Sequence, residues 1–583
     1  KAIECLENAN EKSHLKENYD IIGQAYVKIG QYKKAMQFFS EDLMTDENDK
    51  LKQARAQGNI GRLYVKTGKI RDAIECHGKA LELIKQSKEK NAESKAAEVE
   101  VYCNLGCAYQ ANGQYAKAIE NQEESLKLAE NSNNKSQQGR ALKKIGNIHS
   151  VTGKYKEAID CYYACLEIVE ETKKSTKARV LGKLSCMWSN IGQNDMVITC
   201  LNRQADIAED PADKGRAYAN LGIHFELNGD YVKALEYQEK YLKVAEEMDD
   251  DTEQGHACVN IAKVHLAKNE YKEAIRKSET AEELGNKAVK ARAYSVMGCT
   301  YRELGQYITA KDMHRKEMGM IKFDDNLRKA QANGNLGMAH VGTGDYEEAI
   351  ACFREQMALV KKIEDKREEW RVNENFGNYH AAIGECNKAI FFYNKSLEIA
   401  NTVGDKAGIG RVKGCMGATF TDTGHYQDAV ECHEEELKIA MDFGNKVRKG
   451  QALGNLGNAY VGLCEYQKAI ELLEESKEIA EEYNVQADEK RANRNLGNAY
   501  VATGQYKRAH DFLGKALRIS EQLGHRAAEG RMHESMAKAY YLSGKIEQSI
   551  ESCGKSLFLA RKIGDLAGEG RALGTLSNAY IEF

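Results

Sequence analysis

A motif of about 40 residues recurs along the whole chain and is the strongest constraint on its fold. Its clearest copies are NLGNAYVGLCEYQKAI at 455–470 and NLGNAYVATGQYKRAH at 495–510. We take the glycine of LGNAY, or the residue in its place, as the anchor of each copy. The fifteen anchors are Gly23, Gly61, Gly106, Gly146, Ser185, Gly222, Ala262, Gly298, Gly337, Gly377, Gly417, Gly457, Gly497, Ala537 and Ser577. A chain of 583 residues exceeds one hydrophobic core, which stops growing at roughly 250–300 residues, so a repeat array is predicted.

Each copy has the pattern of a helix, a turn and a second helix. Alanine five before the anchor, leucine one before it and an aromatic or histidine three after it fall on one helical stripe. The small anchor allows a neighbouring helix to approach closely. Glycine seven after the anchor is predicted to end the first helix with a positive φ. The second helix is predicted to begin near the tyrosine nine after the anchor, and its alanine, twelve after, to pack against the first helix.

Leu-Gly-x-x-Tyr followed by Gly-x-Tyr-x-x-Ala resembles the signature of the tetratricopeptide repeat (TPR). The repeat is longer than the common TPR and lacks its usual proline, since Pro211 is the only one in the chain. Its 40-residue form is similar to the Pins/LGN class of G-protein signalling modulators and to the very long TPR proteins of animals. The resemblance implies an all-α, right-handed superhelical solenoid.

The repeat phase predicts the organisation of the chain. Residues 1–12 are predicted to form the second helix of a truncated repeat, 13–565 fourteen complete repeats, and 566–583 the first helix of another truncated repeat. Neither end supplies the polar cap that terminal repeats need. We therefore expect a longer native protein.

Composition excludes several classes of function. With 84 Lys+Arg against 88 Asp+Glu, the net charge of −4 gives no electrostatic case for nucleic acid or an anionic membrane. No apolar run approaches the ~18 residues of a membrane-spanning helix, so membrane insertion is not expected.

The sixteen cysteines fall largely on repeated positions and are predicted to be free, mostly buried thiols. Free thiols favour a cytoplasmic location. No catalytic, phosphate-binding or zinc motif is present, and a TPR solenoid offers no enclosed pocket. We therefore predict no enzyme activity, no cofactor, no metal and no small-molecule substrate.

Three polar columns run along the predicted first helices. Arginine occurs six before the anchor in ten of fifteen repeats, asparagine two before it in eight, and asparagine one after it in five. These offsets span about 60° around a helix and are centred roughly 130° from the apolar stripe. Asparagine forms helices poorly, whereas its amide can both donate to and accept from the peptide groups of an extended ligand. Arginine can bind Asp or Glu with two hydrogen bonds.

The positions match those with which Pins/LGN proteins hold an extended, acidic partner segment. The resemblance therefore implies the same role for these residues. The candidate partner-binding residues are Arg371, Asn375, Asn378, Arg411, Asn455, Asn458, Arg491, Asn495, Asn498, Arg531, Arg216 and Asn220. In the alternative interpretation, the asparagines bridge adjacent helices and the arginines pair with Glu of the next repeat.

The predicted function is a scaffold that binds extended, acidic protein segments in a concave groove. By resemblance to Pins/LGN it would act in cell polarity, spindle orientation or G-protein signalling, although this chain contains no GoLoco motif. The alternative is a regulatory TPR arm of a large protein whose effector, for example a CHAT domain, lies outside these residues. No triplet of repeats completes the carboxylate clamp of chaperone-binding TPR proteins.

Overall fold

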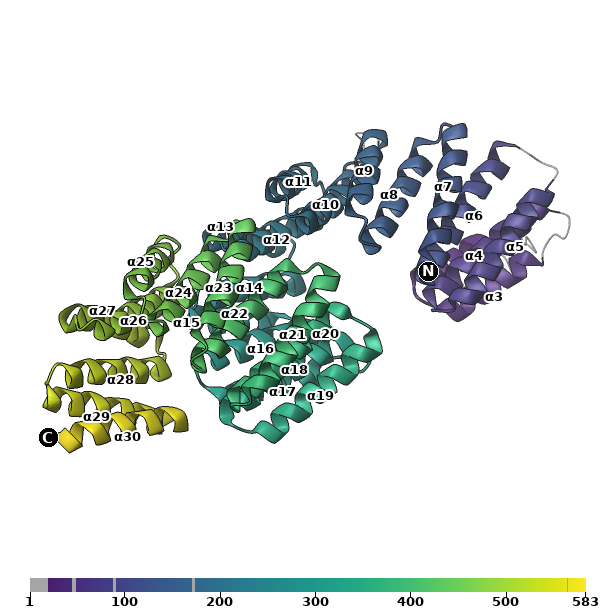
Figure 1. Ribbon diagram of the computed structural model, residues 1–583. Helices are drawn as coiled ribbons and strands as arrows, with labels where there is room; N and C mark the ends of the chain where they lie inside the picture. The colour runs from purple at the N-terminus through teal and green to yellow at the C-terminus, as the bar shows by residue number, and fades with distance from the viewer. Residues whose placement is uncertain (1–18, 45–48, 88–90, 170–172, 564, 583) are drawn as a thin grey trace. The chain divides into compact units, whose positions relative to one another are not determined.

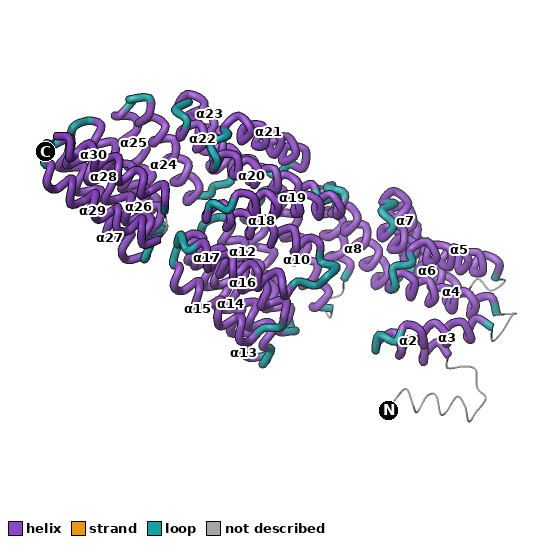
Figure 2. The backbone as a smooth tube through the Cα atoms, turned by 90° about the horizontal axis from the view of Figure 1, so that it is seen from below, coloured by secondary structure: helices purple, strands orange, loops and turns teal. Residues whose placement is uncertain are grey.

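The computed structural model describes residues 19–44, 49–87, 91–169, 173–563 and 565–582. Within these ranges every regular element is a helix and no strand occurs (Figure 1; Figure 2). The predicted all-α solenoid is therefore confirmed. The helix predicted for residues 1–12 lies outside the described residues. The chain divides into two compact units, 1–217 and 218–583.

Helices follow one another in pairs, each a first helix, a short turn and a second helix. Unit 1 contains α2 (Tyr19–Lys28) with α3 (Tyr32–Leu43), α4 (Lys50–Lys66) with α5 (Ile70–Gln86), α6 (Ala92–Ala111) with α7 (Tyr115–Asn131), α8 (Lys135–Val151) with α9 (Tyr155–Ile168), and α10 (Lys174–Ile191) with α11 (Asn194–Ile207). The boundary between the units falls within α12 (Pro211–Leu227).

Unit 2 continues with α13 and eight further pairs, and then α30. Their bounds are α13 (Tyr231–Glu247), α14 (Asp251–Ala267) with α15 (Tyr271–Leu284), α16 (Lys287–Glu303) with α17 (Tyr307–Met320), α18 (Asn326–Thr343) with α19 (Tyr346–Ile363), α20 (Lys366–Ala382) with α21 (Cys386–Val403), α22 (Lys406–Asp422) with α23 (Tyr426–Asp442), α24 (Lys446–Gly462) with α25 (Tyr466–Glu482), α26 (Gln486–Ala502) with α27 (Tyr506–Leu523), α28 (Arg526–Leu542) with α29 (Ile546–Ile563), and α30 (Leu566–Glu582).

The turns inside the repeats follow the glycine predicted seven after the anchor. Gly424 and Gly504 have φ of 79° and 73° and terminate α22 and α26. In most repeats a carboxylate or amide caps the start of the next first helix, as Asp405 Oδ1 accepts from Gly408 N at 2.8 Å, whereas α10, α26 and α28 begin after Lys173, Val485 and His525 without such a cap. The left-handed glycine and the N-cap together set where each helix stops and starts.

The close approach predicted at the anchors is confirmed, and the approaching element is the second helix of the same repeat. A Cβ atom at Gly377 would lie 2.4 Å from the ring of Tyr393, and one at Gly337 would lie 2.5 Å from the ring of Phe353. Both partners follow their anchors by sixteen residues and are fully buried. The anchor is therefore small because the sixteenth residue after it occupies the space that a side chain would need.

A buried hydroxyl also joins the two helices of several repeats. Ser396 Oγ donates to Trp370 O at 2.8 Å, and Ser476 Oγ donates to Gly450 O at 2.7 Å. Each serine lies nineteen after its anchor and each carbonyl seven before it. This bond satisfies both groups inside the repeat.

Successive first helices contact one another as well as their own second helices, as α14 does with α16 and α24 with α26. We call the surface that the first helices present away from their second helices the inner face. The apolar stripe points into the repeat, where Val372 and Phe376 of α20 are buried. On the same helix Arg371, Asn375 and Asn378 keep some exposure.

Unit 2 also makes a contact between repeats that are distant in sequence. Asn445 Nδ2 donates to Leu227 O at 2.9 Å, which links the start of α24 to the turn after α12. Beside this bond, Val447 lies against Gly229. The succession of repeats from the end of α12 to the start of α24 therefore curves enough to bring these two helix ends into contact within unit 2.

Substitution at an anchor tests this packing. Gly377→Ala would place a methyl group against Tyr393 and is expected to destabilise unit 2 by about 1–3 kcal/mol. Gly319→Ala, in α17 with no atom within 4 Å of the added Cβ, is expected to stabilise it by up to about 1 kcal/mol. Urea unfolding followed by circular dichroism should move the midpoint in opposite directions. Equal midpoints would contradict the anchor's role.

Candidate functional site

The predicted polar columns line a groove on the inner face of unit 2. Side chains from α16, α18, α20 and α22, with one each from α17 and α19, surround a hollow of about 540 Å³. Arg371, Asn375, Asn378 and Arg411 all contribute to its wall. The structure thus brings together four of the predicted residues from two successive repeats.

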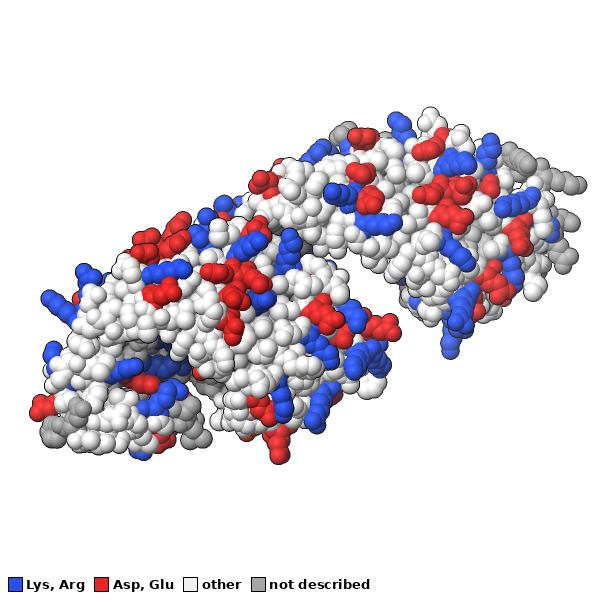
Figure 3. All heavy atoms as spheres, in the orientation of Figure 1, with Lys and Arg blue, Asp and Glu red and all other residues white. Residues whose placement is uncertain are grey.

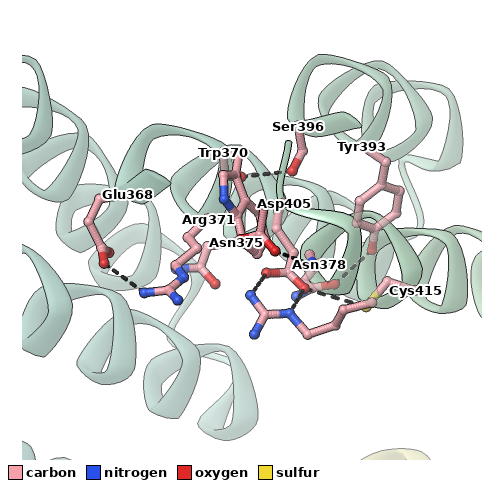
Figure 4. A network of polar contacts seen from close by, with 12 residues as sticks. Glu368, Trp370, Arg371, Asn375, Asn378, Tyr393, Ser396, Asp405 and Cys415 are labelled. Atoms are coloured by element: carbon pink, nitrogen blue, oxygen red, sulfur yellow. Dashed lines mark hydrogen bonds and ion pairs between the residues drawn. The ribbon is translucent and has the colours of Figure 1, made fainter. Parts of the chain in front are cut away.

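The groove's arginines are already paired with the groove's own carboxylates (Figure 4). Arg411 donates from Nε and Nη2 to the two oxygens of Glu374, at 2.8 and 2.6 Å, and lies 4.9 Å from the ring centre of Trp370. Arg371 donates to Glu368 at 2.7 Å. Both carboxylates are buried. An acidic ligand at these two arginines would therefore have to compete with an existing ion pair.

The asparagines two before the anchor link neighbouring helices. Asn375 Nδ2 donates to Gln356 Oε1 at 3.1 Å, and Asn455 Nδ2 donates to Glu436 Oε2 at 3.4 Å. Both acceptors belong to the second helix of the preceding repeat. Asn495 is buried and receives hydrogen bonds from Arg494 at 3.2 and 3.3 Å. This column thus makes the bridges of the alternative interpretation.

The asparagines one after the anchor divide into two kinds. Asn378 Oδ1 accepts from the hydroxyl of Tyr393 at 2.8 Å, so its orientation is fixed within the repeat. At Asn458 and Asn498 the residue in the tyrosine's place is Leu473 or Leu513, which has no hydroxyl. Both amides are half-buried and make no hydrogen bond to any residue in the described ranges. These two side chains can hydrogen-bond to a ligand without losing a bond within the protein.

The same columns line a second groove, in unit 1. There α2, α4 and α6 surround a hollow of about 500 Å³ whose wall includes Arg55, Asn59 and Asn104. Asn59 donates to Asp20 at 2.6 Å, and Arg55 forms an ion pair with Glu93.

The remaining predicted residues of α12 lie on either side of the unit boundary. In unit 1, Arg216 is exposed and forms an ion pair with the buried Asp213. In unit 2, Asn220 is exposed.

Sequence reasoning missed a cluster of cations on α26 and α28. Lys490 is 9% exposed, and its Nζ lies 3.1 Å from His525 Nδ1. Arg494 donates only to the amide oxygen of Asn495, and Nε of Arg531 is buried without a hydrogen-bond partner in the described residues. Of these, only Arg531 had been predicted. Lys490 and Arg494 stand seven and three before their anchor, outside the repeated columns, so counting repeats could not find them.

Burial and neighbouring cations change the ionisation of this cluster. Burial, then Arg531, Arg494 and Arg491, lower the pKa of Lys490 to about 8. Burial, followed by Lys490 and Arg531, lowers the pKa of His525 to about 3, so this imidazole is neutral and accepts from Lys490. Asp488 is engaged elsewhere, since it accepts from Arg491 and Gln451, each at 2.9 Å.

The described residues contain no group of three or more His, Cys, Asp or Glu side chains placed to hold a metal ion. All fifteen described cysteines are free; six are buried, seven half-buried and two, Cys186 and Cys464, exposed. The expectation of mostly buried thiols thus holds for fewer than half of those described. Among the described helices, none is both long and apolar enough to span a membrane.

The tetratricopeptide repeat family model matches residues 52–131, 95–171, 328–402, 408–482 and 450–522, and a second model of the same repeat matches 17–47. These matches cover more than half of the chain, which therefore belongs to the tetratricopeptide repeat family. The more specific likeness to the Pins/LGN class or to the very long animal TPR proteins stays a prediction.

The comparisons also find individual relatives. The Tonsoku-like protein of Danio rerio is 24% identical over 228 residues, covering 36% of this chain and 15% of that protein. A chain in the crystal structure of the APC/C hetero-tetramer Cut9-Hcn1 aligns with a TM-score of 0.55 and 13% identity, over 97% of this chain and 96% of that one. Yeast Tom70 aligns with a TM-score of 0.40 and 14% identity, over 89% of this chain and 100% of that one. At such identity, the Cut9-Hcn1 match concerns the fold.

Loss of Glu374 tests whether its pair with Arg411 holds the groove together. Glu374→Ala would leave the half-exposed Arg411 without its carboxylate and is expected to destabilise unit 2 by about 1–2 kcal/mol, less than a fully buried pair would. Glu93→Ala, which removes the exposed partner of Arg55, should change stability by about 0–1 kcal/mol. Urea midpoints of the two variants provide the comparison, and a larger loss in Glu93→Ala would contradict this account.

The depressed pKa of Lys490 predicts a stability that rises in alkaline solution. Below pH 8 the ammonium is charged in both the folded and unfolded states, and its burial opposes folding. Between about pH 8 and 10.5 the folded state loses this proton first, so stability should increase by up to roughly 3 kcal/mol. Lys490→Met should be more stable than wild type at pH 7, with the difference shrinking towards pH 10. A difference that does not change with pH would refute the prediction.

Proposed function

We propose that this TPR chain is a protein-interaction scaffold whose inner face holds an extended segment of a partner protein. The observation that carries the proposal is the pair of unpartnered, half-buried amides of Asn458 and Asn498, on the neighbouring first helices α24 and α26. The fold is shared with a chain of the Cut9-Hcn1 hetero-tetramer, which associates with other proteins, and this supports the same class of role.

The spacing of first helices suits an extended backbone. Packed helices lie about 8–10 Å apart, and an extended chain advances about 3.3 Å per residue. Asn458 and Asn498 would therefore meet peptide groups about three residues apart. Because an amide both donates and accepts, it can bind a peptide group whatever side chain the partner carries.

We propose that the preferred partner segments are acidic. The arginines along the inner face do not contribute equally to this preference. Arg371 and Arg411 are neutralised by Glu368 and Glu374, so they contribute little attraction. The attraction comes instead from Lys490, Arg494 and Arg531, which form no ion pair with any carboxylate in the described residues.

The wider biological role rests on resemblance alone. A part in cell polarity, spindle orientation or G-protein signalling follows from the likeness to the Pins/LGN class. In the alternative, the chain is a regulatory arm of a larger protein, and it would bind its partner segment with the same inner face. The sequence following Phe583 in the gene would distinguish the two, since GoLoco motifs favour the first and an α/β domain the second.

The double variant Asn458→Ala/Asn498→Ala tests the proposal. Binding of a fluorescent library of Asp- and Glu-rich dodecapeptides to the 583-residue chain is measured by anisotropy. We expect affinity to fall about fivefold or more, because two lost hydrogen bonds together contribute about 1–3 kcal/mol. The unfolding midpoint should not change.

Asn378→Ala is the matched control. Because it leaves the hydroxyl of Tyr393 without its acceptor, it should lower the unfolding midpoint. The proposal fails if the double variant binds the library as tightly as wild type, if it lowers the midpoint as the control does, or if the library does not bind wild type.

A further inference from the structure

Three cations lie together on the inner face of unit 2, and no carboxylate in the described part of the chain forms an ion pair with them. Lys490 and Arg494 come from α26 and Arg531 from α28. In the described residues, Lys490 meets the neutral His525, Arg494 meets the amide of Asn495, and Arg531 makes no hydrogen bond or ion pair. Every polar contact of the cluster is therefore to an uncharged group.

The acids near this cluster are committed to other partners. Asp565, whose charge acts on Arg531, accepts from Gly568 N at 2.8 Å at the start of α30. Glu534, which also acts on Arg531, pairs with Arg571 at 3.2 Å. Neither lies within ion-pair distance of Arg531.

Most other arginines of the same column differ in this respect. Arg55, Arg216, Arg371, Arg411, Arg491 and Arg571 each pair with an Asp or Glu of the chain. At these six positions the protein itself neutralises the column, whereas Arg292 bonds to the uncharged groups of His256 and Asn260. Cations held together with no counter-charge repel one another, and burial strengthens the repulsion. An anion from outside the chain would remove this cost.

The cluster is open to such an anion. Arg494 and Arg531 are half-buried rather than enclosed. Figure 3 shows a hollow in the surface near α26 and α28 in which Lys and Arg side chains lie together with Asp or Glu side chains.

The number of cations distinguishes between possible anions. One carboxylate carries a single charge and would leave two of the three cations uncompensated. A phosphate monoester carries about −1.5 to −2 at pH 7 and has three acceptor oxygens. Two guanidinium groups and one ammonium supply the matching donors.

We propose that Lys490, Arg494 and Arg531 form a subsite for a phosphate group, carried on a phosphorylated side chain of the segment bound to the inner face. That the phosphate is carried on a bound partner segment rests on the proposed function. That the three cations bind a phosphate group does not. Asn498, one helical turn from Arg494 on α26, would hold the backbone beside the phosphorylated residue.

The test compares two degenerate dodecapeptide libraries that differ only in a central phosphoserine or serine. Their binding to the 583-residue chain is measured by fluorescence anisotropy at two salt concentrations. The site variant is Arg494→Gln/Arg531→Gln. The control, Arg508→Gln/Arg518→Gln, removes the same charge from exposed positions of α27.

A second arm uses inorganic phosphate and no peptide. The melting temperature is measured with millimolar phosphate and with chloride at equal ionic strength. Because phosphate stabilises folded proteins in general, the informative quantity is the extra shift in wild type over the site variant. Without phosphate, the site variant should melt no lower than wild type, since it removes repelling charges.

We expect wild type to bind the phosphoserine library at least tenfold more tightly than the serine library. The site variant should lose this preference and the control should keep it. Equal binding of the two libraries, with no extra phosphate shift in wild type, would overturn the subsite while leaving the scaffold function intact. A wild-type-specific phosphate shift with no binding of either library would support the subsite and refute the scaffold function. A site variant that melts well below wild type would show that the cations are structural.

Discussion

The structure of every repeat depends on a side chain that fills the space left by the anchor. Tyr393, Phe353 and His433 differ in chemistry, yet each lies against a glycine sixteen residues earlier. Protein interiors are packed too densely to admit even one further methyl group there. Since one helix pair cannot bury its own apolar surface, this contact also fixes how each pair meets the next. The placement of every residue on the inner face follows from it.

Most polar side chains on that face hold neighbouring helices together and are therefore not free to bind a partner protein. Asn375 joins α20 to α19, and the Arg411–Glu374 pair joins α22 to α20. A buried ion pair adds little net stability, but losing one partner is costly, so such pairs fix the relation between neighbouring repeats. A repeated polar residue is therefore not a binding residue merely because it faces the groove. What distinguishes Asn458 and Asn498 is that no residue in the described part of the chain hydrogen-bonds to them.

The features that every repeat shares could be predicted from the sequence, because packing imposes them at the same offset each time. The helices, the left-handed Gly424 and Gly504, the small anchors and the groove-lining columns belong to this group. The partners of those columns could not be predicted. Glu374 pairs with Arg411, 37 residues later, and it stands at a position where several other repeats have glycine. The hydroxyl of Tyr393 fixes Asn378, but repeats with leucine at the position of Tyr393 lack this bond. Such pairings depend on how one repeat is rotated against the next, which the pattern does not specify.

In a repeat array, departures from the pattern are therefore more informative about binding than the pattern itself. Lys490 and Arg494 are not explained by packing that other repeats share, and they add charge where the described residues supply no paired carboxylate. A buried cation without a counter-ion costs free energy in the unbound protein, and a bound anion removes that cost. At Arg411 the same anion would first have to displace Glu374. An anionic group on a bound segment is therefore stabilised more by the cations between α26 and α28 than by Arg411, although both lie on the inner face.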